Sequence, residues 1–488
     1  MQYPLKSLFF IGLVALVGSG CGGGGGSSSR STAITLATTG SSLPEPHSQC
    51  SLSEARRDVL DIMEDFYFFN EFPEQVAKYA DVRSRLNTFG SVDALLDELR
   101  YQPGSFDRGF TYYATVEEVD QFFSAGEFFG FGFSVGIDAA GDWRLIDVFG
   151  GSPADDAGLT RGATILSVDG IPTSSLDLNA ESTFGPSEVG LERTLGVRLL
   201  DGTPDTVTLA KRAVDLDPVP PSRVRVFDVG GRMVGYIFFR TFIENADDLL
   251  RAAMIELQDQ AIALGGTGID DLVIDFRYNG GGLVGTAEVL GSLMAGSARQ
   301  DNNTLFFRYE YNDWVTTNYG DASDFRYFRG EPAALEGLES VYYITDAGTA
   351  SASELTISGM APYMTRSVTV GARTYGKPVG QWGLEYCNNS MVLFVVTFRT
   401  VNVDGEADYY TGIPENCTVA DDWDHLLGDP EEGRLDAVLD DIEANGGLCL
   451  PAQPVMRAAA QSLYGAPVFE RPGSIEGPTL ASKLIRAF

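Results

Sequence analysis

The stretch DLVIDFRYNGGGLVGTAEVLGSLMA, residues 271–295, decides the fold class of this chain. It begins with an apolar run, 271–276, that has the length and β-branched content of a buried strand. Gly280, Gly281 and Gly282 follow, and residues 284–295 then have the composition of a helix. A strand that passes through a glycine turn into a helix indicates an α/β domain.

The same alternation continues on both sides of this stretch. Strand-like apolar runs and helical segments succeed one another over residues 214–450, which we predict to be one α/β domain. Residues 451–488 would be a C-terminal extension. The further strand-like runs are 233–239, 340–345, 367–373 and 391–401, and the further helical segments are 245–264 and 351–361.

The 488 residues leave room for additional domains upstream of this core. Residues 51–69 and 92–100 carry apolar side chains at helical spacing, so we predict a small helical segment over 49–126. From Phe128 onward the pattern changes to short apolar runs separated by glycine, which is typical of strands. We therefore expect a β-rich domain over residues 127–213.

The order of motifs in this β-rich stretch resembles a PDZ domain. The more specific part is GSPADDAGL, residues 151–159, followed by GATILSVDG, residues 162–170. The resemblance implies a glycine-rich loop whose N–H groups bind the terminal carboxylate of a peptide, which adds to the sheet as a strand. Gly130, Phe131, Gly132 and Phe133 occupy that loop position. The alternative is a small β-barrel that has only a packing role.

The N-terminus has the features of an export signal over residues 1–20. Lys6 precedes a short apolar run, and a small-residue triplet leads to Cys21. This arrangement resembles a bacterial lipobox, which implies a lipid on Cys21 and a periplasm-facing lipoprotein of the cell envelope, in the outer membrane. Gly18 stands where that motif usually has leucine. Residues 21–48 would be a flexible tether, and the alternative is an ordinary cleaved signal, after which the protein is still exported.

Composition excludes some partners. The chain has 34 basic and 68 acidic residues, a net charge of −34, and would repel a phosphate backbone, so we expect no nucleic-acid partner. Besides Cys21, four cysteines remain, an even number that suggests up to two disulfides in an exported chain. Of the three possible pairings we favour Cys387 with Cys417 and Cys50 with Cys449. No Cys/His spacing suggests a metal, and we expect no cofactor.

The scarcity of histidine and lysine narrows the possible catalytic bases. His47 and His425 are the only histidines, so a Ser-His-Asp triad would depend on His425. Lys377 is the only lysine between residues 212 and 482. Lysine can act as a general base because burial lowers its pKa, which arginine does not allow. The alternative for Lys377 is a surface lysine.

Two further segments could complete a catalytic site. In DAGTASASELTISG, residues 346–359, Ser351 stands at the start of a helix, where backbone N–H groups are free to bind an oxyanion. The alternative for Ser351 and Ser353 is helix capping. Glycines 280–282 would let the backbone approach a substrate, and the alternative for them is a plain tight turn.

Together these segments resemble the C-terminal processing, or tail-specific, serine proteases over about residues 127–450. The resemblance rests on TASASE at 349–354, TYGK at 374–377 and DFRYNGGG at 275–282. It implies a multidomain α/β protein with a crotonase-like α/β protease core, an inserted β-rich PDZ domain and the small N-terminal helical segment. Gly280 replaces the family's usual proline, which leaves the loop geometry open.

The resemblance also implies roles for individual residues. Ser351 would be the nucleophile, Lys377 the base and Gln381 the side chain that orients the lysine. The N–H groups of Gly281 and Ala352 would form the oxyanion hole. We thus expect a serine endopeptidase acting on polypeptides with accessible C-termini. The alternative is a non-catalytic PDZ or ligand-binding lipoprotein of the same fold, and an esterase is disfavoured because no GxSxG motif occurs.

Overall fold

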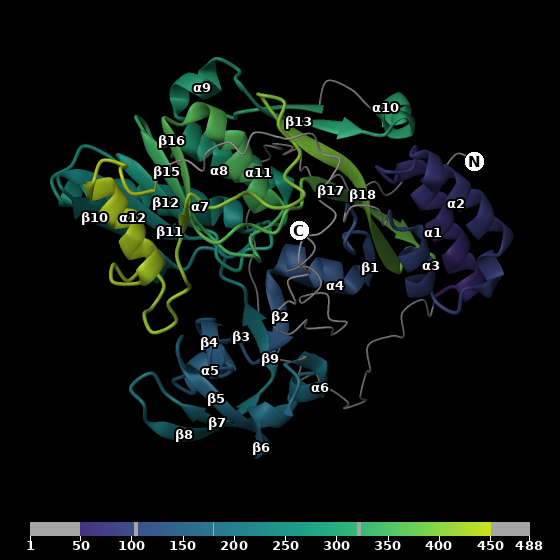
Figure 1. Ribbon diagram of the computed structural model, residues 1–488, viewed down its shortest axis with the longest axis horizontal. Helices are drawn as coiled ribbons and strands as arrows, with labels where there is room; N and C mark the ends of the chain where they lie inside the picture. Colours follow the sequence, from purple (N-terminus) through teal and green to yellow (C-terminus); the bar gives the residue numbers. More distant parts are fainter. Residues whose placement is uncertain (1–48, 102–105, 179, 320–323, 450–488) are drawn as a thin grey trace, which may run out of the picture.

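The computed structural model describes residues 49–101, 106–178, 180–319 and 324–449. The expected export signal, the tether with Cys21, and the C-terminal extension lie outside the described residues. Figure 1 shows three parts: a helical segment in purple, a β-rich domain in blue to teal, and an α/β core that carries the remaining elements. Within the described ranges, no helix is both long and apolar enough to cross a membrane.

The core is built on a six-stranded sheet in the order β10-β11-β12-β15-β16-β19. Five of these strands are parallel, and β10 pairs with β11 in the antiparallel sense. The central strands β12 and β15 are buried along their whole length, which explains why their sequences are continuous apolar runs. The strands are β10 (Val224–Val229), β11 (Arg232–Phe238), β12 (Asp271–Asp275), β15 (Ser340–Thr345), β16 (Arg366–Gly371) and β19 (Cys417–Thr418).

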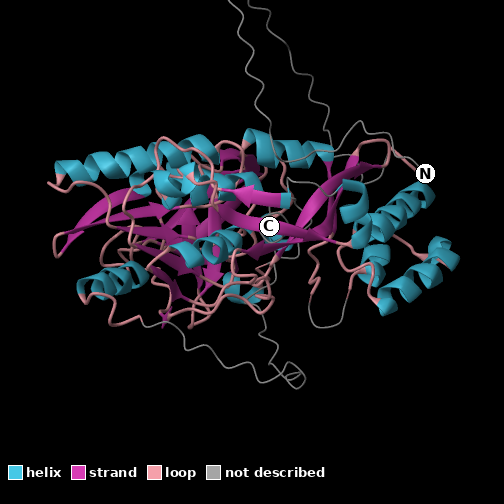
Figure 2. Cartoon of the chain, turned by 90° about the horizontal axis from the view of Figure 1, so that it is seen from above, coloured by secondary structure: helices cyan, strands magenta, loops and turns pink. Residues whose placement is uncertain are grey.

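Helices cover both faces of this sheet, as Figure 2 shows from above. On one face, α7 (Ala246–Ala263), α8 (Val284–Ala295) and α11 (Ala352–Met360) contribute to the largest apolar core. On the other face, α12 (Gly433–Glu443) packs Leu435, Val438 and Ile442 against side chains from β11, β12, β15 and β16. The helices and strands expected for the α/β core therefore occur, and their ends lie within two residues of the expected ones.

A second, antiparallel sheet joins the core to the helical segment. Its longest strand, β18, pairs with β17, with β1 and with β13, so that it extends from the core to the first helices. The strands are β1 (Tyr112–Thr115), β13 (Leu305–Tyr311), β14 (Phe325–Tyr327), β17 (Val379–Tyr386) and β18 (Met391–Asn402). The segment 49–126 is thus not helical throughout, because β1 belongs to this sheet.

The helical segment packs against one face of the β17–β18 hairpin. Its helices α1 (Leu52–Phe66), α2 (Pro73–Ser84) and α3 (Val92–Leu99) bury apolar side chains together with Leu384, Tyr386 and Leu393. Ser51 begins α1 with a capping box that also involves Glu54. Two short helical elements follow β1: α4 (Val116–Asp120) and a π-helical turn, η3 (Gln121–Ala125).

The β-rich domain follows as a separate sheet with its own apolar core. Its strand order is β3-β4-β5-β7-β8, with β6 paired to β5, so β3 is an edge strand. A two-stranded ribbon of β2 and β9 leads into and out of the domain. The elements are β2 (Glu127–Gly130), β3 (Phe133–Ile137), β4 (Trp143–Val148), α5 (Pro153–Asp156), β5 (Thr164–Val168), β6 (Ile171–Pro172), α6 (Ala180–Phe184), β7 (Glu192–Arg198), β8 (Pro204–Ala210) and β9 (Arg212–Asp215).

Two disulfides are present, but the favoured pairing is wrong. Cys50 is bonded to Cys387 and Cys417 to Cys449. Cys387 lies in the turn between β17 and β18, and this hairpin extends away from the α/β sheet toward the start of α1. Cys417 instead lies on the edge strand β19, whose neighbour β16 packs against α12, the helix that precedes Cys449. Sequence distance alone does not reveal these two neighbourhoods.

Candidate active site

Ser351 lies where strand β15 has ended and helix α11 begins. Its backbone has φ +56° and ψ −114°, a region that residues other than glycine seldom adopt. Such strain costs about 1–3 kcal/mol and concentrates at functional sites. Ser353, in contrast, is fully buried, and its hydroxyl donates to the carbonyl of Asn279 at 3.2 Å. The strained and partly exposed Ser351 is therefore better placed than Ser353 to react with a substrate.

Lys377 lies in the interior, with 1% of its surface exposed, so the alternative of a surface lysine does not hold. Its Nζ donates to Gln381 Oε1 at 2.8 Å, and Gln381 Nε2 donates to the carbonyl of Phe110 at 2.7 Å. Nζ also lies 5.2 Å from the centre of the Phe110 ring. Burial lowers the pKa of Lys377 well below its ordinary value, against the opposing charges of Asp107 and Glu354.

Glu354 holds the serine and lysine segments together. Its Oε2 accepts the backbone N–H of Ser351 at 3.0 Å and that of Lys377 at 2.8 Å. Its Oε1 accepts the Gly376 N–H at 2.7 Å and the Thr374 hydroxyl at 2.5 Å. Because one carboxylate oxygen binds both backbones, residues 351 and 377 are fixed within two hydrogen-bond lengths of each other. Burial raises the pKa of Glu354, although these four hydrogen bonds oppose the shift.

The glycine turn after β12 lies beside Ser351 because the carboxyl ends of parallel β12 and β15 meet at one edge of the sheet. The N–H of Ala350 donates to the carbonyl of Asn279 at 3.1 Å, which connects the two segments. Gly281 and Gly282 have φ of +98° and +139°, and a Cβ on Gly282 would lie 2.0 Å from the Phe242 carbonyl oxygen. This turn therefore requires glycine.

One of the two expected oxyanion donors is already hydrogen-bonded to another group of the protein. The Gly281 N–H donates to Asn279 Oδ1 at 2.9 Å, while Asn279 Nδ2 donates to the Phe239 carbonyl at 2.8 Å. Ala352 stands at the first position of α11, where backbone N–H groups have no partner within the helix. A substrate oxyanion that is to use both donors must therefore displace the Asn279 side chain from Gly281.

A buried network of ion pairs lies next to the glycine turn that follows β12. Arg277, which has no exposed surface, binds Asp275, Glu432 and Asp421, with N–O distances of 2.6–3.0 Å for the closest pairs. Arg161 from the β-rich domain reaches the same network and donates to Asp421 at 2.8 Å and to the Tyr278 hydroxyl at 2.9 Å. Tyr278 itself has a positive φ of +66° and immediately precedes Asn279. The β-rich domain is thus linked directly to the turn.

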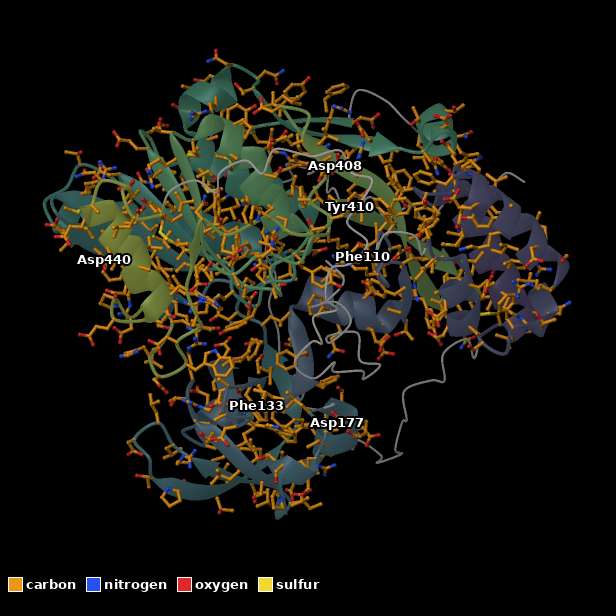
Figure 3. All side chains as sticks on the ribbon, viewed as in Figure 1. Phe110, Phe133, Asp177, Asp408, Tyr410 and Asp440 are labelled. Atoms are coloured by element: carbon orange, nitrogen blue, oxygen red, sulfur yellow. A yellow bond between two sulfur atoms is a disulfide. The ribbon has the colours of Figure 1, made fainter. Side chains whose placement is uncertain are left out.

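Residues 107–111 form a wall of the site that the sequence did not reveal. Asp107 accepts the N–H groups of Phe110 and Thr111 and the Tyr67 hydroxyl, which fixes the position of Phe110 under Lys377. Arg108 donates to the carbonyls of Tyr375 and Gly376 at 2.9 and 2.7 Å. Figure 3 places Phe110 and Tyr410 in the middle of the molecule, between the helical segment and the core. The two Arg108 contacts connect residues 267 and 268 positions apart, and no local pattern signals them.

The remaining predicted residues lie elsewhere. Gly130 to Phe133 span the end of β2 and the start of edge strand β3, and Figure 3 shows Phe133 in the β-rich domain, apart from Phe110. A Cβ on Gly132 would clash with Ser152 at 2.0 Å. His425 is partly exposed, and its ring pairs with Asp422 at 2.6 Å. Among the described residues, no group of three or more potential metal ligands is arranged to hold an ion.

Replacing Gln381 by leucine is expected to lower kcat/KM for peptide hydrolysis by about 10-fold, because Lys377 loses its hydrogen-bond acceptor. The same acceptor stabilises the charged lysine, so its loss should lower the lysine pKa further and move the rising limb of the pH–rate profile to lower pH. Gln258→Leu on helix α7 is the control. If the rising limb of the pH–rate profile of Gln381→Leu lay at the same pH as that of the wild type, a role of Gln381 in positioning Lys377 would be contradicted.

Comparison with known proteins agrees with these features. Residues 233–419 match the model of peptidase family S41. The chain is 28% identical over 304 residues to a carboxyl-terminal-processing protease of Synechocystis, a match that covers 61% of this chain and 62% of the relative. It is 27% identical over 294 residues to the carboxy-terminal processing protease CtpB of Bacillus subtilis, covering 60% and 55%. The matches thus span less than two thirds of these relatives.

A solved structure supports the fold. The crystal structure of a putative S41 protease from Bacteroides fragilis superposes with a TM-score of 0.58 at 22% identity and covers 79% of this chain and 97% of that one. This likeness shows the mixed α/β fold with several sheets. Together with the sequence matches, it confirms the resemblance to C-terminal processing proteases.

Proposed function

We propose that this chain, whose core matches peptidase family S41, is a serine endopeptidase that hydrolyses polypeptides with a Ser351–Lys377 dyad. One observation carries the proposal. The backbone N–H groups of a strained serine and of a fully buried lysine of lowered pKa bind the same Glu354 oxygen. A lysine whose pKa is lowered by burial can act as the base that a serine nucleophile needs where histidine is absent.

The reaction begins when neutral Lys377 removes the proton from the Ser351 hydroxyl. Ser351 Oγ attacks the scissile carbonyl carbon, and the N–H groups of Ala352 and Gly281 bind the resulting oxyanion, the latter after release from Asn279. Lys377 then gives its proton to the leaving amine, which leaves an ester on Ser351. Water, deprotonated by Lys377, hydrolyses this ester and regenerates the enzyme.

The β-rich domain is proposed to capture the substrate as a PDZ domain does. Its strand β3 is an edge strand with one side unpaired among the described strands, and the loop of residues 130–133 stands at its start. An unstructured peptide can add to such an edge through backbone hydrogen bonds while the loop N–H groups bind its carboxylate. Arg161 gives this domain a direct contact with the turn that precedes Gly281.

Replacing Arg161 by methionine is expected to lower kcat by about 10-fold while the affinity for a C-terminal peptide stays unchanged. The variant loses the bonds to Tyr278 and Asp421 but keeps the proposed peptide-binding loop. Steady-state kinetics and fluorescence anisotropy measure the two quantities separately. Arg198→Met, an exposed position in the same domain, is the control. Equal loss of kcat in both variants would remove the case for this link.

Export and lipidation are also part of the proposal. Two disulfides in the described residues suit an oxidising compartment, and Cys21 would be the lipid anchor. In bacterial cells given an alkyne-tagged fatty acid, we expect the protein to be labelled and to sediment with membranes. Cys21→Ser should remove both the label and the membrane association, and a labelled Cys21→Ser protein would refute the assignment.

The decisive test of function is covalent labelling combined with turnover. The protein is treated with a fluorophosphonate, which reacts with activated serines, and the adduct is located by peptide mass spectrometry. We expect the adduct on Ser351 and loss of hydrolysis of an unfolded protein. Ser351→Ala should be unlabelled and inactive. An adduct on another serine, or unchanged hydrolysis in Ser351→Ala, would exclude the proposed nucleophile, and peptide binding without hydrolysis in the wild type would favour a binding protein.

A further inference from the structure

A pocket lies between the β17–β18 hairpin and the short helical elements that follow β1. It has a cavity volume of about 70 Å³ and is partly open to solvent. Its walls are mainly apolar and are formed by Val116, Val119, Phe123, Leu283, Val392 and Phe394.

Two residues that line the pocket lie close in the chain to residues of the proposed catalytic site. Leu283 directly follows the glycine turn that carries Gly281, and its N–H donates to the Phe242 carbonyl at 2.8 Å. Gly383 lies two residues beyond Gln381 on β17, and therefore on the same face of that strand. At a rise of about 3.3 Å per residue, the backbone of Gly383 lies about 7 Å along the strand from that of Gln381.

The rim of the pocket is acidic. Asp120, Glu244 and Glu385 line it, and no lysine or arginine does. Asp120 and Glu244 are exposed and Glu385 is partly buried, and none of the three has an ion pair with a described basic side chain. Burial raises the pKa of the half-buried Glu385, and the negative charge of Asp120 adds to the shift.

We propose that this pocket receives an arginine or lysine side chain of the substrate residue adjacent to the scissile bond. The methylene stem lies along the apolar walls, and the cation binds the carboxylates of Glu385 and Asp120. An apolar side chain would fill the walls but would cover Glu385 without a partner for its charge, which is unfavourable. This inference rests on the proposed peptidase function and adds a substrate preference to it.

The test uses two unstructured peptides that differ only in one residue, arginine in one and its uncharged isostere citrulline in the other. Binding is measured first with the full-length Ser351→Ala protein, in which no turnover interferes. We expect the arginine peptide to bind about 10-fold more tightly. Adding Glu385→Gln and Asp120→Asn should bring the ratio close to one. Glu117→Gln, an exposed carboxylate on α4 outside the pocket, controls for the general attraction of a chain with net charge −34.

Two outcomes would overturn the proposal: equal binding of the two peptides, or a preference that survives in the Glu385→Gln, Asp120→Asn protein. Turnover by the otherwise unchanged enzyme, with the cut located by mass spectrometry, separates this inference from the proposed function. Cleavage without preference for bonds next to arginine refutes the pocket alone. Discrimination in binding without any cleavage refutes the peptidase and leaves a cation-selective peptide site.

Discussion

Replacing Lys377 by methionine is expected to lower kcat for peptide hydrolysis by about 10³-fold. Methionine keeps the length and the apolar stem of the side chain but has no amine to accept the Ser351 proton. Lys377→Arg should be equally inactive at every pH, because a guanidinium does not lose its proton in proteins. Lys78→Met, which removes a partly buried lysine in the helical segment, serves as the control.

The pH dependence of the wild type follows from the same side chain. In the proposed mechanism the protein is active only when Lys377 is neutral, so kcat/KM should rise with pH through the pKa of the lysine. Because burial lowers that pKa well below 10.5, the plateau should be reached far below the pH at which an exposed lysine titrates. A rising limb centred near 10.5, or activity retained in Lys377→Met, would contradict the assignment of Lys377 as the base.

Lys377→Met should raise the stability of the protein although it lowers its activity. In the unfolded chain Lys377 carries its proton up to about pH 10.4, whereas the folded protein holds it less tightly. The unfolded state therefore binds more protons between the two pKa values, and the contribution of Lys377 to stability rises with pH across that window. At neutral pH, Lys377→Met removes this cost, and thermal melting should show a higher Tm than wild type.

Replacing Arg277 by methionine is expected to lower the free energy of unfolding by about 3–5 kcal/mol. The substitution leaves Asp275 and Glu432, both without exposed surface, with no cation between them. Arg277→Lys should rescue little, because one ammonium cannot replace the two-pronged bonds to both carboxylates. Urea unfolding followed by tryptophan fluorescence measures the loss. Arg83→Met, which breaks only exposed ion pairs, should cost less than about 1 kcal/mol.

Acid should distinguish the Arg277 variant from the wild type. Burial alone would raise the pKa of Asp421, but Arg277, Arg434 and Arg161 lower it well below its ordinary value. A carboxyl with a depressed folded-state pKa stabilises the protein above its unfolded pKa, so wild-type stability should fall as the pH drops below about 4. In Arg277→Met, protonation of the unpaired carboxylates relieves the buried charge. The deficit relative to wild type should therefore shrink in acid, and a deficit independent of pH would contradict this account.

The sequence predicted those parts of the protein that local patterns encode. Apolar runs predicted the strands β12, β15 and β18, because burial on both faces leaves few polar residues in a strand. The composition and spacing of residues in the intervening segments predicted helices α7 and α8. The motif around Ser351 and the isolation of Lys377 among arginines pointed to two side chains whose backbones share one Glu354 oxygen. The role of Glu354 was not predicted, because its four hydrogen bonds, one from Ser351 and three from residues 374–377, leave no trace in spacing.

Contacts distant in sequence could not be predicted in this way. Nothing near Phe110 in the sequence signals that its carbonyl accepts a hydrogen bond from the Gln381 side chain or that its ring lies under Lys377. The hydrogen bond from the Gly281 N–H to Asn279 lies in a turn where Tyr278 has a positive φ, a conformation that a tyrosine in the sequence does not signal. The disulfide pairing was wrong because it depends on the direction in which the β17–β18 hairpin leaves the core.

The bond between Gln381 and Phe110 spans 271 residues, and this distance has a consequence for the timing of assembly. Chains grow from the N-terminus at about 5–20 residues per second, so the two partners are synthesised tens of seconds apart. During that interval the β-rich domain, which lies wholly between them, can already fold on its own core. Gln381 reaches Phe110 only after β17 has been made and has docked on the N-terminal part of the chain. In a nascent chain, the β-rich domain can therefore be folded well before the proposed catalytic site is complete.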